Sequence, residues 1–207
     1  MSHSPNYFQR RSIRLKGYDY SQDGLYYITI CVQKRECLFG DMTVGTYPCG
    51  RPDINDENVQ NDISQYVQND ISLYGQPQGH APTMRLNDAG KMVEKQWLAL
   101  TDRFPNVQLH EFVVMPDHFH GILEIVPDVG ASPCGRPLNN KTVGDMMDAF
   151  KSITTVEYIR GVKTMDWTPF NGKLWQRNYY EHIIRDFDAF VRISEYIREN
   201  PEKWGGK

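Results

Sequence analysis

Two histidines, His118 and His120, stand on either side of Phe119 in the segment MPDHFHGIL. Side chains alternate between the two faces of a β-strand, so a strand here would place both imidazoles on one face and Phe119 on the apolar face. Two neighbouring imidazoles can bind a divalent metal ion. The pattern alone is a weak signal, because two surface histidines on a half-exposed strand produce it more often than a metal site does.

The last predicted helix offers a second group of side chains with chemical potential, Tyr196 and Asn200. At about 100° per residue its apolar residues share one face, which we expect to pack against the core. These residues are Phe187, Phe190, Val191 and Ile197. Tyr196 lies nearly opposite the centre of that face, so its hydroxyl is expected to point outward, with Asn200 beside it one turn later as a neutral oxygen ligand. The alternative is an exposed tyrosine with an ordinary asparagine at a helix end.

The elements that must position these residues follow from periodicity and from turn and capping signals. Asp186 is expected to begin the last helix and Pro201 to end it, and Thr142 with Asp145 resembles a capping box. In order, the prediction is a strand at 25–33, a helix at 86–102, a hairpin at 107–115 and 118–126, a helix at 142–160, a loop and short strand within 174–184, and the last helix. Helices and antiparallel strands in one small domain predict an α+β fold. The ferredoxin-like sandwich fits best, with helices on one face of an antiparallel sheet and a C-terminal helix that carries the tyrosine.

The chain has 207 residues and is expected to form a single domain, 1–207, with two surface insertions. The stretch at about 44–81 contains the sequence VQNDIS twice in close succession. The stretch at about 127–141 contains PCGRP, which also occurs in the first stretch. Such short duplications do not have the period of a solenoid, and long surface loops cost little stability. We therefore interpret both stretches as insertions; functional binding loops are the alternative.

Composition limits the class of protein only in part. The formal net charge is −3 and the pI about 6.1, which argues weakly against nucleic acid as a partner. Basic residues nevertheless crowd the N-terminus, so a basic surface is not excluded. The four cysteines form no C-x-x-C pair, so zinc is not expected and we interpret them as free thiols in a reducing cytoplasm. Since the sequence has neither a long apolar run nor an apolar signal core, we expect no membrane span and no export.

Four blocks of the sequence, taken together, point to one family. They are RRSIRLKGYDYS…GLYYITICVQKRECLFGD, MPDHFHGIL, LWQRNYYEHIIRD and EYIRENP. In this order they resemble the REP-associated tyrosine transposases, which belong to the single-tyrosine HUH transposase superfamily of insertion-sequence type. The resemblance implies that His118 and His120 are metal ligands, that Tyr196 is the nucleophile and that Asn200 is the third metal ligand. Related insertion-sequence transposases usually have glutamine at the last position, where this chain has the shorter amide. The family fold is the same ferredoxin-like sandwich.

The resemblance implies an enzyme, a transposase that cleaves and rejoins single-stranded DNA at hairpin-forming repeats. Mg²⁺ or Mn²⁺ would polarise the scissile phosphate, and attack by Tyr196 would leave a 5′-phosphotyrosine and a free 3′-OH. The partner would be single-stranded or hairpin DNA, bound by a monomer or homodimer in the bacterial cytoplasm or nucleoid. Two alternatives stay open: an HUH replication initiator or relaxase-type nickase, and a non-catalytic descendant that binds hairpin DNA.

Several side chains are candidates for contact with DNA. The basic candidates are Arg10, Arg11, Arg14, Lys16 and Lys151. A solvated basic arm is the alternative for the N-terminal four. Trp175 and Gln176 can stack on and hydrogen-bond an unpaired base, although a tryptophan is more often part of a core.

Two further tyrosines compete with Tyr196 for the role of nucleophile. Tyr179 and Tyr180 precede His182, and a hydroxyl near a histidine is a possible pair of nucleophile and base. We prefer Tyr196, because both the family motif and the helix face favour it. Tyr179 and Tyr180 are then expected to pack or to touch DNA, and His182 to be structural.

Overall fold

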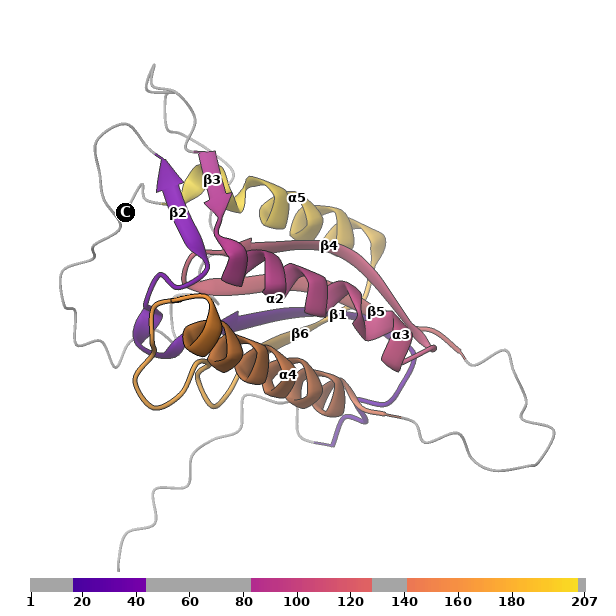
Figure 1. Cartoon of the computed structure of the whole chain (residues 1–207). Helices are drawn as coiled ribbons and strands as arrows, with labels where there is room; N and C mark the ends of the chain where they lie inside the picture. The colour runs from indigo at the N-terminus through magenta and orange to yellow at the C-terminus, as the bar shows by residue number, and fades with distance from the viewer. Residues whose placement is uncertain (1–16, 44–82, 128–140, 205–207) are drawn as a thin grey trace, which may run out of the picture.

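The computed structural model of the chain describes residues 17–43, 83–127 and 141–204. Nearly all of the two predicted insertions lies outside these residues, so their interpretation stays a prediction. Figure 1 shows an antiparallel sheet with helices packed around it. No helix in the described ranges combines the length and the apolar character needed to cross a membrane.

Four antiparallel strands form the main sheet, in the spatial order β4-β5-β1-β6. They are β1 (Gly24–Cys31), β4 (Val107–Met115), β5 (His118–Ile125) and β6 (Tyr180–Ile184). Two further strands, β2 (Gly40–Thr43) and β3 (Thr83–Leu86), pair with each other in a separate ribbon. Periodicity did not predict this ribbon, because strands of four residues are too short to show an alternating pattern. Their pairing places Thr43 opposite Thr83.

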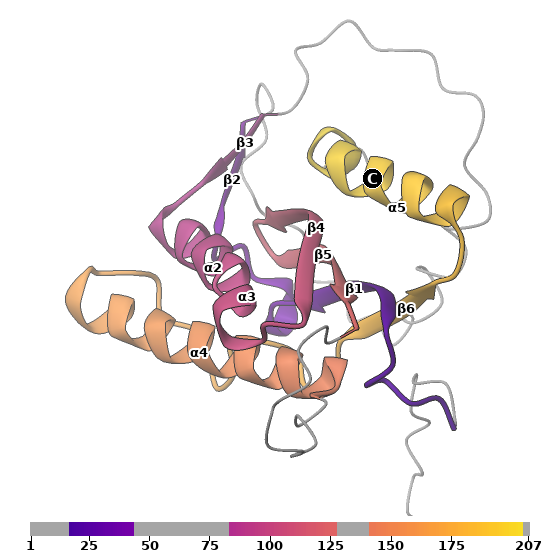
Figure 2. The ribbon, with the colours of Figure 1, turned by 90° about the vertical axis from the view of Figure 1, so that its right-hand side faces the viewer.

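Helices cover both faces of the main sheet. Helices α2 (Asp88–Leu98), α3 (Leu100–Arg103) and α4 (Val143–Thr164) lie on one side, and α5 (Phe187–Lys203) crosses the other (Figure 2). The chain order β1, α2, β4, β5, α4, β6, combined with the strand order of the sheet, is the split βαβ arrangement of ferredoxin-like folds. The predicted α+β sandwich, with a C-terminal helix that carries Tyr196, is confirmed.

The main apolar core lies between the sheet and helices α2 and α4. Phe119 and Leu123 of β5 are fully buried there together with Trp97 of α2 and Phe150 of α4. The ring centroids of Phe119 and Trp97 are 4.6 Å apart. Because neighbouring residues of a strand point to opposite faces, the burial of Phe119 in this core directs His118 and His120 toward α5.

Helix α4 begins where its capping signal predicts. Thr142 Oγ1 accepts a hydrogen bond from Asp145 N at 3.2 Å, and Thr142 N donates to Asp145 Oδ2 at 2.9 Å. The helix continues four residues past the predicted end at 160, to Thr164. No proline interrupts it there, and its hydrogen-bond ladder extends to Met165 N, which donates to Gly161 O at 2.8 Å.

Helix α5 begins after Asp186, whose side chain accepts a hydrogen bond from Ala189 N at 2.7 Å, as its capping signal predicts. The predicted end at Pro201 is wrong, because the helix runs through this proline to Lys203. A proline lacks one N–H donor, and in the last turn that loss affects a single backbone hydrogen bond, so the helix can continue briefly.

The predicted core face of α5 is only partly correct. Ile197 is fully buried in a small apolar cluster between the helix and the sheet, whereas Phe187 is 76% exposed. That cluster consists of Tyr27, Ile122, Ile184 and Ile197. Phe187 lies in the first turn of the helix, where its ring packs on Phe190. The buried positions of α5 are Ser194, Ile197 and Asn200, so the helix turns Asn200 toward the sheet.

Replacing Ile197 with alanine is expected to lower the free energy of unfolding by about 2–5 kcal/mol, because it empties a fully buried position between α5 and the sheet. Urea denaturation of the purified chain measures this loss. The matched control is Arg192→Ala, at an exposed position of the same helix, which should change the free energy by less than about 0.5 kcal/mol. Equal effects of the two substitutions would contradict the burial of Ile197.

Candidate active site

Strand β5 places His118 and His120 side by side on the face of the sheet that α5 covers. Each residue is 4% exposed, and the centroids of the two rings are 4.6 Å apart. In the pairing with β1, His118 lies opposite Cys31 and His120 lies opposite Thr29. The predicted common face is confirmed. The alternative of two surface histidines is wrong, because both side chains are buried.

His120 is held through its Nδ1 atom. Tyr27 OH lies 2.8 Å and Thr29 Oγ1 2.9 Å from this nitrogen, and the rings of Tyr27 and His120 stack with centroids 5.7 Å apart. Burial lowers the pKa of His120 well below its ordinary value, and the neighbouring His118 and Arg35 lower it further. The imidazole of His120 is therefore neutral at pH 7.

His118 is held by the residue that precedes it. Its Nδ1 atom lies 2.5 Å from Asp117 Oδ1, and Asp117 Oδ2 forms an ion pair with Arg35 Nε at 2.9 Å. Burial lowers the pKa of His118, although the Asp117 carboxylate raises it in part. We therefore interpret the contact as a neutral ring whose Nδ1–H donates to the carboxylate. This leaves the other ring nitrogen, Nε2, with a lone pair for a ligand.

Helix α5 brings Tyr196 and Asn200 to the two histidines. The Tyr196 ring centroid lies 5.5 Å from that of His120 and 6.5 Å from that of Tyr27. The side chain of Asn200 lies near those of His118 and Tyr196, since it raises the pKa of the first and lowers the pKa of the second. The structure thus gathers in one place the four residues that the sequence motifs single out, two from β5 and two from α5.

Tyr196 is not simply turned outward, as the helix pattern predicted. It is 37% exposed and its ring lies against the sheet, because α5 turns Asn200, which is 8% exposed, toward the sheet. Burial raises the pKa of Tyr196, while the hydrogen bond with Asn200 and the charges of Arg35 and Lys203 lower it in part. Without a ligand, Tyr196 is a neutral phenol at pH 7.

The donors at this site fit a divalent cation. Two neutral imidazoles, each anchored through Nδ1, meet the amide of Asn200. Histidines that bind metals are commonly oriented by such a hydrogen bond at the second ring nitrogen. Within residues 17–43, 83–127 and 141–204, no three His, Cys, Asp or Glu side chains are arranged to hold a metal ion. A cation here would therefore depend on Asn200 and on oxygen atoms of a substrate.

The prediction that Trp175 stacks on a DNA base is wrong. Its side chain is 4% exposed, its Nε1 donates to Thr154 Oγ1 at 2.9 Å, and its ring centroid lies 5.0 Å from that of Phe39. The cause is an isolated backbone bridge between Val32 and Trp175, which draws this part of the loop onto the end of β1 and into the core.

Lys151 and Gln176 are half-buried and engaged within the protein. Lys151 Nζ donates to the carbonyl oxygens of Gln176 and Arg177 at 2.8 and 2.9 Å, and Gln176 Nε2 donates to Val32 O at 3.4 Å. Both side chains hold the loop before β6 in place, so their contact with DNA stays a prediction. The other predicted contacts lie outside the described residues: Arg10, Arg11, Arg14 and Lys16.

The residues that orient the histidines were missed by the sequence motifs. They are Tyr27, Thr29 and Asp117, and Asp117 is in turn paired with Arg35. A signal for Tyr27 and Thr29 existed, because an alternating strand places both on one face of β1. Their partner could not be identified without the register of β1 against β5. Asp117 was interpreted only as a turn residue, and Arg35 lies in a loop with no periodic pattern.

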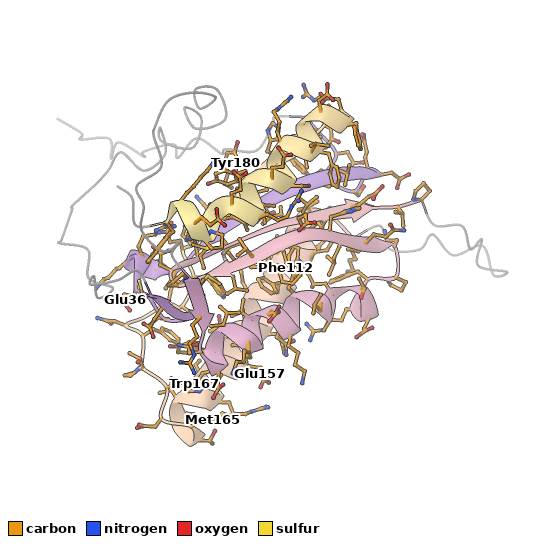
Figure 3. All side chains as sticks on the ribbon, turned by 90° about the horizontal axis from the view of Figure 1, so that it is seen from above. Glu36, Phe112, Glu157, Met165, Trp167 and Tyr180 are labelled. Carbon is orange, nitrogen blue, oxygen red and sulfur yellow. The ribbon has the colours of Figure 1, made fainter. Side chains whose placement is uncertain are left out.

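Tyr180 is the competing tyrosine that comes near the histidine pair. It lies on β6 beside α5 (Figure 3), opposite Thr29 in the strand pairing, and its ring centroid is 6.2 Å from that of Tyr27. The Tyr196 ring, by contrast, adjoins His120 itself. His182 is exposed and lies opposite Tyr27 on β6, separated from β5 by β1.

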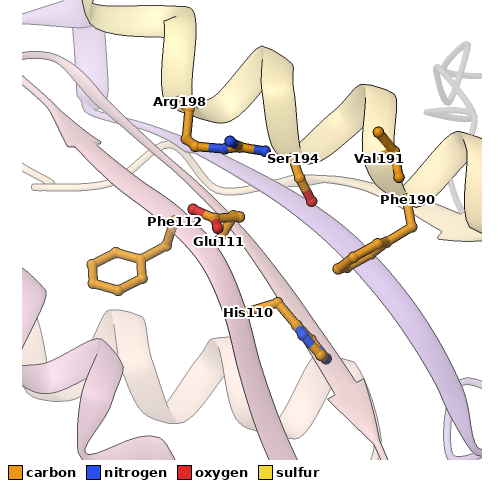
Figure 4. Close-up of a pocket in the computed structure, with 7 residues that line it drawn as sticks. All are labelled: His110, Glu111, Phe112, Phe190, Val191, Ser194 and Arg198. Carbon is orange, nitrogen blue, oxygen red and sulfur yellow. The ribbon is translucent and has the colours of Figure 1, made fainter.

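A separate groove of about 320 Å³ lies between α5 and β4 (Figure 4). Its lining residues are His110, Glu111, Phe112, Phe190, Val191, Ser194 and Arg198. They include the irregular part of β4, where the register against β5 shifts. Ser194 Oγ is buried without a hydrogen-bond partner in the described structure. The lining contains neither histidine of the pair nor Tyr196, so the groove is distinct from the candidate active site.

Fold and site together define a class of protein: a ferredoxin-like α+β domain with two buried histidines on a sheet strand and a tyrosine on the helix that covers them. A protein of Haemophilus influenzae (strain ATCC 51907 / DSM 11121 / KW20 / Rd), described as an uncharacterized protein, is 35% identical over 209 residues, which cover 94% of this chain and 89% of that protein. The chain belongs to the family of this Haemophilus influenzae protein. No family model matches the chain.

Two solved structures are more distant neighbours. One is a REP-associated tyrosine transposase bound to a REP hairpin, with 15% identity, a TM-score of 0.47, and coverage of 94% of this chain and 75% of that one. The other is a protein of Deinococcus radiodurans R1 provisionally described as a transposase, with 14% identity, a TM-score of 0.41, and coverage of 90% and 95%. Both similarities are too distant to establish what this chain does.

Acidification below the ordinary histidine pKa of about 6.5 is expected to destabilise the fold. Burial lowers the pKa of His118 and His120 in the folded state, so the unfolded chain binds more protons as the pH falls below that value, and stability falls with it. Urea denaturation at a series of pH values from 8 to 5, in the presence of a chelator, measures this dependence. His120→Gln removes one of the two groups and should give a shallower decline. An unchanged slope in this variant would contradict a neutral, buried His120.

Proposed function

We propose that this protein is a transposase that cleaves and rejoins single-stranded DNA at hairpin-forming repeats through a covalent link to Tyr196. The observation that carries the proposal is the meeting of Tyr196 with the histidine pair: the centroid of its ring lies 5.5 Å from that of His120, and the buried Asn200 lies one turn further along the same helix. The resemblance of four sequence blocks to REP-associated tyrosine transposases supports the same conclusion.

Three side chains are proposed to bind and orient the scissile phosphate through a divalent cation. His118 and His120 would hold the ion through Nε2, since each Nδ1 is already bound by the protein, and Asn200 would add its amide oxygen. When bound, Mg²⁺ or Mn²⁺ would supply positive charge that polarises the phosphate and favours loss of the phenolic proton. Asp117 and the pair Tyr27 and Thr29 keep the two rings in place.

Tyr196 is proposed to be the nucleophile. Its phenolic oxygen would form a bond to phosphorus while the bond between phosphorus and the 3′ oxygen breaks. The phenolic proton is lost, and the 3′ oxygen takes up a proton to become a hydroxyl. The product is a 5′-phosphotyrosine, which keeps the ester bond, so a 3′-OH can later reverse the step. DNA strands would thereby be rejoined without a nucleoside triphosphate as a source of energy.

The partial burial of Tyr196 is a reason to expect that its chemistry awaits the substrate. Burial raises the pKa of the phenol, and a neutral phenol is a weak nucleophile. Asn200 and the charge of Arg35 oppose this effect only in part. The positive charge of a bound cation would favour loss of the phenolic proton of Tyr196.

Tyr196→Phe is expected to abolish covalent attachment of DNA, because it removes the attacking oxygen while keeping the ring that packs on His120. The measurement is a denaturing gel of the protein after incubation with 5′-overhanging hairpin oligonucleotides and Mn²⁺, with hairpin binding measured separately by a mobility shift. Binding should change little. Tyr180→Phe, at the tyrosine beside the site, is the matched control and should keep the adduct. Loss of the adduct in the control, and its persistence in Tyr196→Phe, would assign the reaction to Tyr180.

His118→Ala is expected to abolish cleavage and to weaken Mn²⁺ binding, because it removes one of the two imidazoles that would hold the ion. Titration of Mn²⁺ followed by electron paramagnetic resonance measures the binding of the ion, and the denaturing gel measures cleavage. His182→Ala, at an exposed histidine on β6, is the matched control and should leave both unchanged. Unaltered, metal-dependent cleavage by His118→Ala would rule out the proposed metal site.

A further inference from the structure

We propose that Arg35 is a positioning residue of this site, which sets the orientation of His118 by pairing with Asp117 through one nitrogen while another nitrogen is anchored on Cys31. The inference rests on the proposed function, because it treats His118 as a ligand of the metal ion. It assigns a role to a side chain that no sequence motif singles out and that lies more than eighty residues before His118 in the chain.

The side chain of Arg35 spans two anchor points beside the histidines. Its Nε forms an ion pair with Asp117 Oδ2 at 2.9 Å, and its Nη1 donates a hydrogen bond to Cys31 Sγ at 2.9 Å. Cys31 is the strand residue opposite His118 in the pairing of β1 with β5. The guanidinium is therefore held at two separate nitrogens, which sets both its position and the tilt of its plane.

The carboxylate of Asp117 links Arg35 to His118, because it contacts both side chains. The Asp117 side chain is 3% exposed; one of its oxygens is paired with the Arg35 guanidinium and the other lies 2.5 Å from His118 Nδ1. A buried carboxylate is costly unless it is paired with a cation and hydrogen-bonded, and Arg35 supplies that cation. The chain of contacts runs from Arg35 through Asp117 to His118.

Backbone hydrogen bonds place Arg35 next to the turn between β4 and β5, which contains Asp117. Val32 N donates to Asp117 O at 2.9 Å, and the N–H groups of Leu38 and Phe39 donate to Pro116 O at 2.9 and 3.0 Å. The segment that follows β1 is thus hydrogen-bonded to the turn between β4 and β5 both before and after Arg35 in the sequence.

The same segment contains a short 3-10 turn, η1 (Gln33–Arg35). Two consecutive residues of this turn, Lys34 and Arg35, lie in the left-handed region of the backbone, both with φ of 58°. Non-glycine residues adopt this conformation at a cost and keep it where the surrounding contacts determine it. The two anchors of the Arg35 side chain and the three backbone hydrogen bonds to the turn are such contacts.

An arginine can contact Asp117 and Cys31 at the same time, whereas a lysine cannot. A guanidinium is planar and presents its N–H groups in a fixed fork, whereas an ammonium is a single point on a flexible stem. Arg35→Lys would keep a positive charge near the histidines but could not hold Asp117 and Cys31 at once. Comparing lysine with glutamine at this position therefore separates the geometry of Arg35 from its charge.

The decisive measurement is the Mn²⁺ dissociation constant of the full chain, followed by electron paramagnetic resonance, for the unaltered protein, Arg35→Gln and Arg35→Lys. Both variants are expected to bind Mn²⁺ about 10–100-fold more weakly, the usual effect of removing a partner that orients a ligand histidine. Arg160→Gln, at an exposed arginine paired with Glu157 on α4, is the matched control and should bind like the unaltered chain. Affinity close to that of the unaltered chain in Arg35→Lys would overturn the inference, because charge alone would then suffice.

A double-mutant cycle keeps the inference testable if Arg35 also affects folding. Asp117→Asn should weaken Mn²⁺ binding by itself, and adding Arg35→Gln to it should cause little further loss, because Arg35 acts through Asp117. Fully additive losses would overturn this route. If the unaltered chain binds no Mn²⁺, the proposed metal site fails and this inference with it; if it binds and the Arg35 variants bind equally well, only the inference fails.

Discussion

The alternation of side chains along β5 is the constraint on which the site depends. This strand is sandwiched between two layers of helices, so each of its residues must suit either the main core or the face beneath α5. Phe119 fills the core against Trp97, and the same pleat directs His118 and His120 to the opposite side. A register slip of one residue would bury the imidazoles among apolar rings and turn Phe119 toward α5.

Burying two imidazoles side by side requires that both be neutral and that both have partners. Burial and proximity to one another favour the uncharged rings. Asp117 satisfies one Nδ1, and Tyr27 with Thr29 satisfies the other. The remaining nitrogens belong to rings that are already neutral and oriented, which is the state a metal ion requires of its ligands. Helix α5 completes the site, because Tyr196 and Asn200 are one turn apart on its surface.

Much of this arrangement could be predicted from the sequence because it is encoded in local patterns. The His-x-His alternation, the capping residues Thr142 and Asp186, and the hairpin around Pro116 are short-range signals, and each appears in the structure as expected. The rotation of α5 was predicted less well, since an average over all apolar positions gave Phe187 the same weight as Ile197.

Features that depend on pairing between distant segments could not be predicted in this way. The burial of Trp175 results from a bridge to Val32, and Asp117, which contacts His118, is paired with Arg35 from a distant segment. Neither of these two contacts produces a periodic pattern in the sequence. The residues that support a site come from whichever segments the topology brings to it, whereas the residues that perform its chemistry are confined to recognisable motifs.

The measurement that tests the central claim most directly is the location of the covalent link between protein and DNA. The unaltered chain would be incubated with Mn²⁺ and a library of 5′-overhanging hairpin oligonucleotides, digested with a protease and a nuclease, and analysed by mass spectrometry for nucleotide-modified peptides. The account predicts a metal-dependent modification on Tyr196, joined through a 5′ phosphate. A modification on Tyr179 or Tyr180, or hairpin binding with no covalent product, would contradict it.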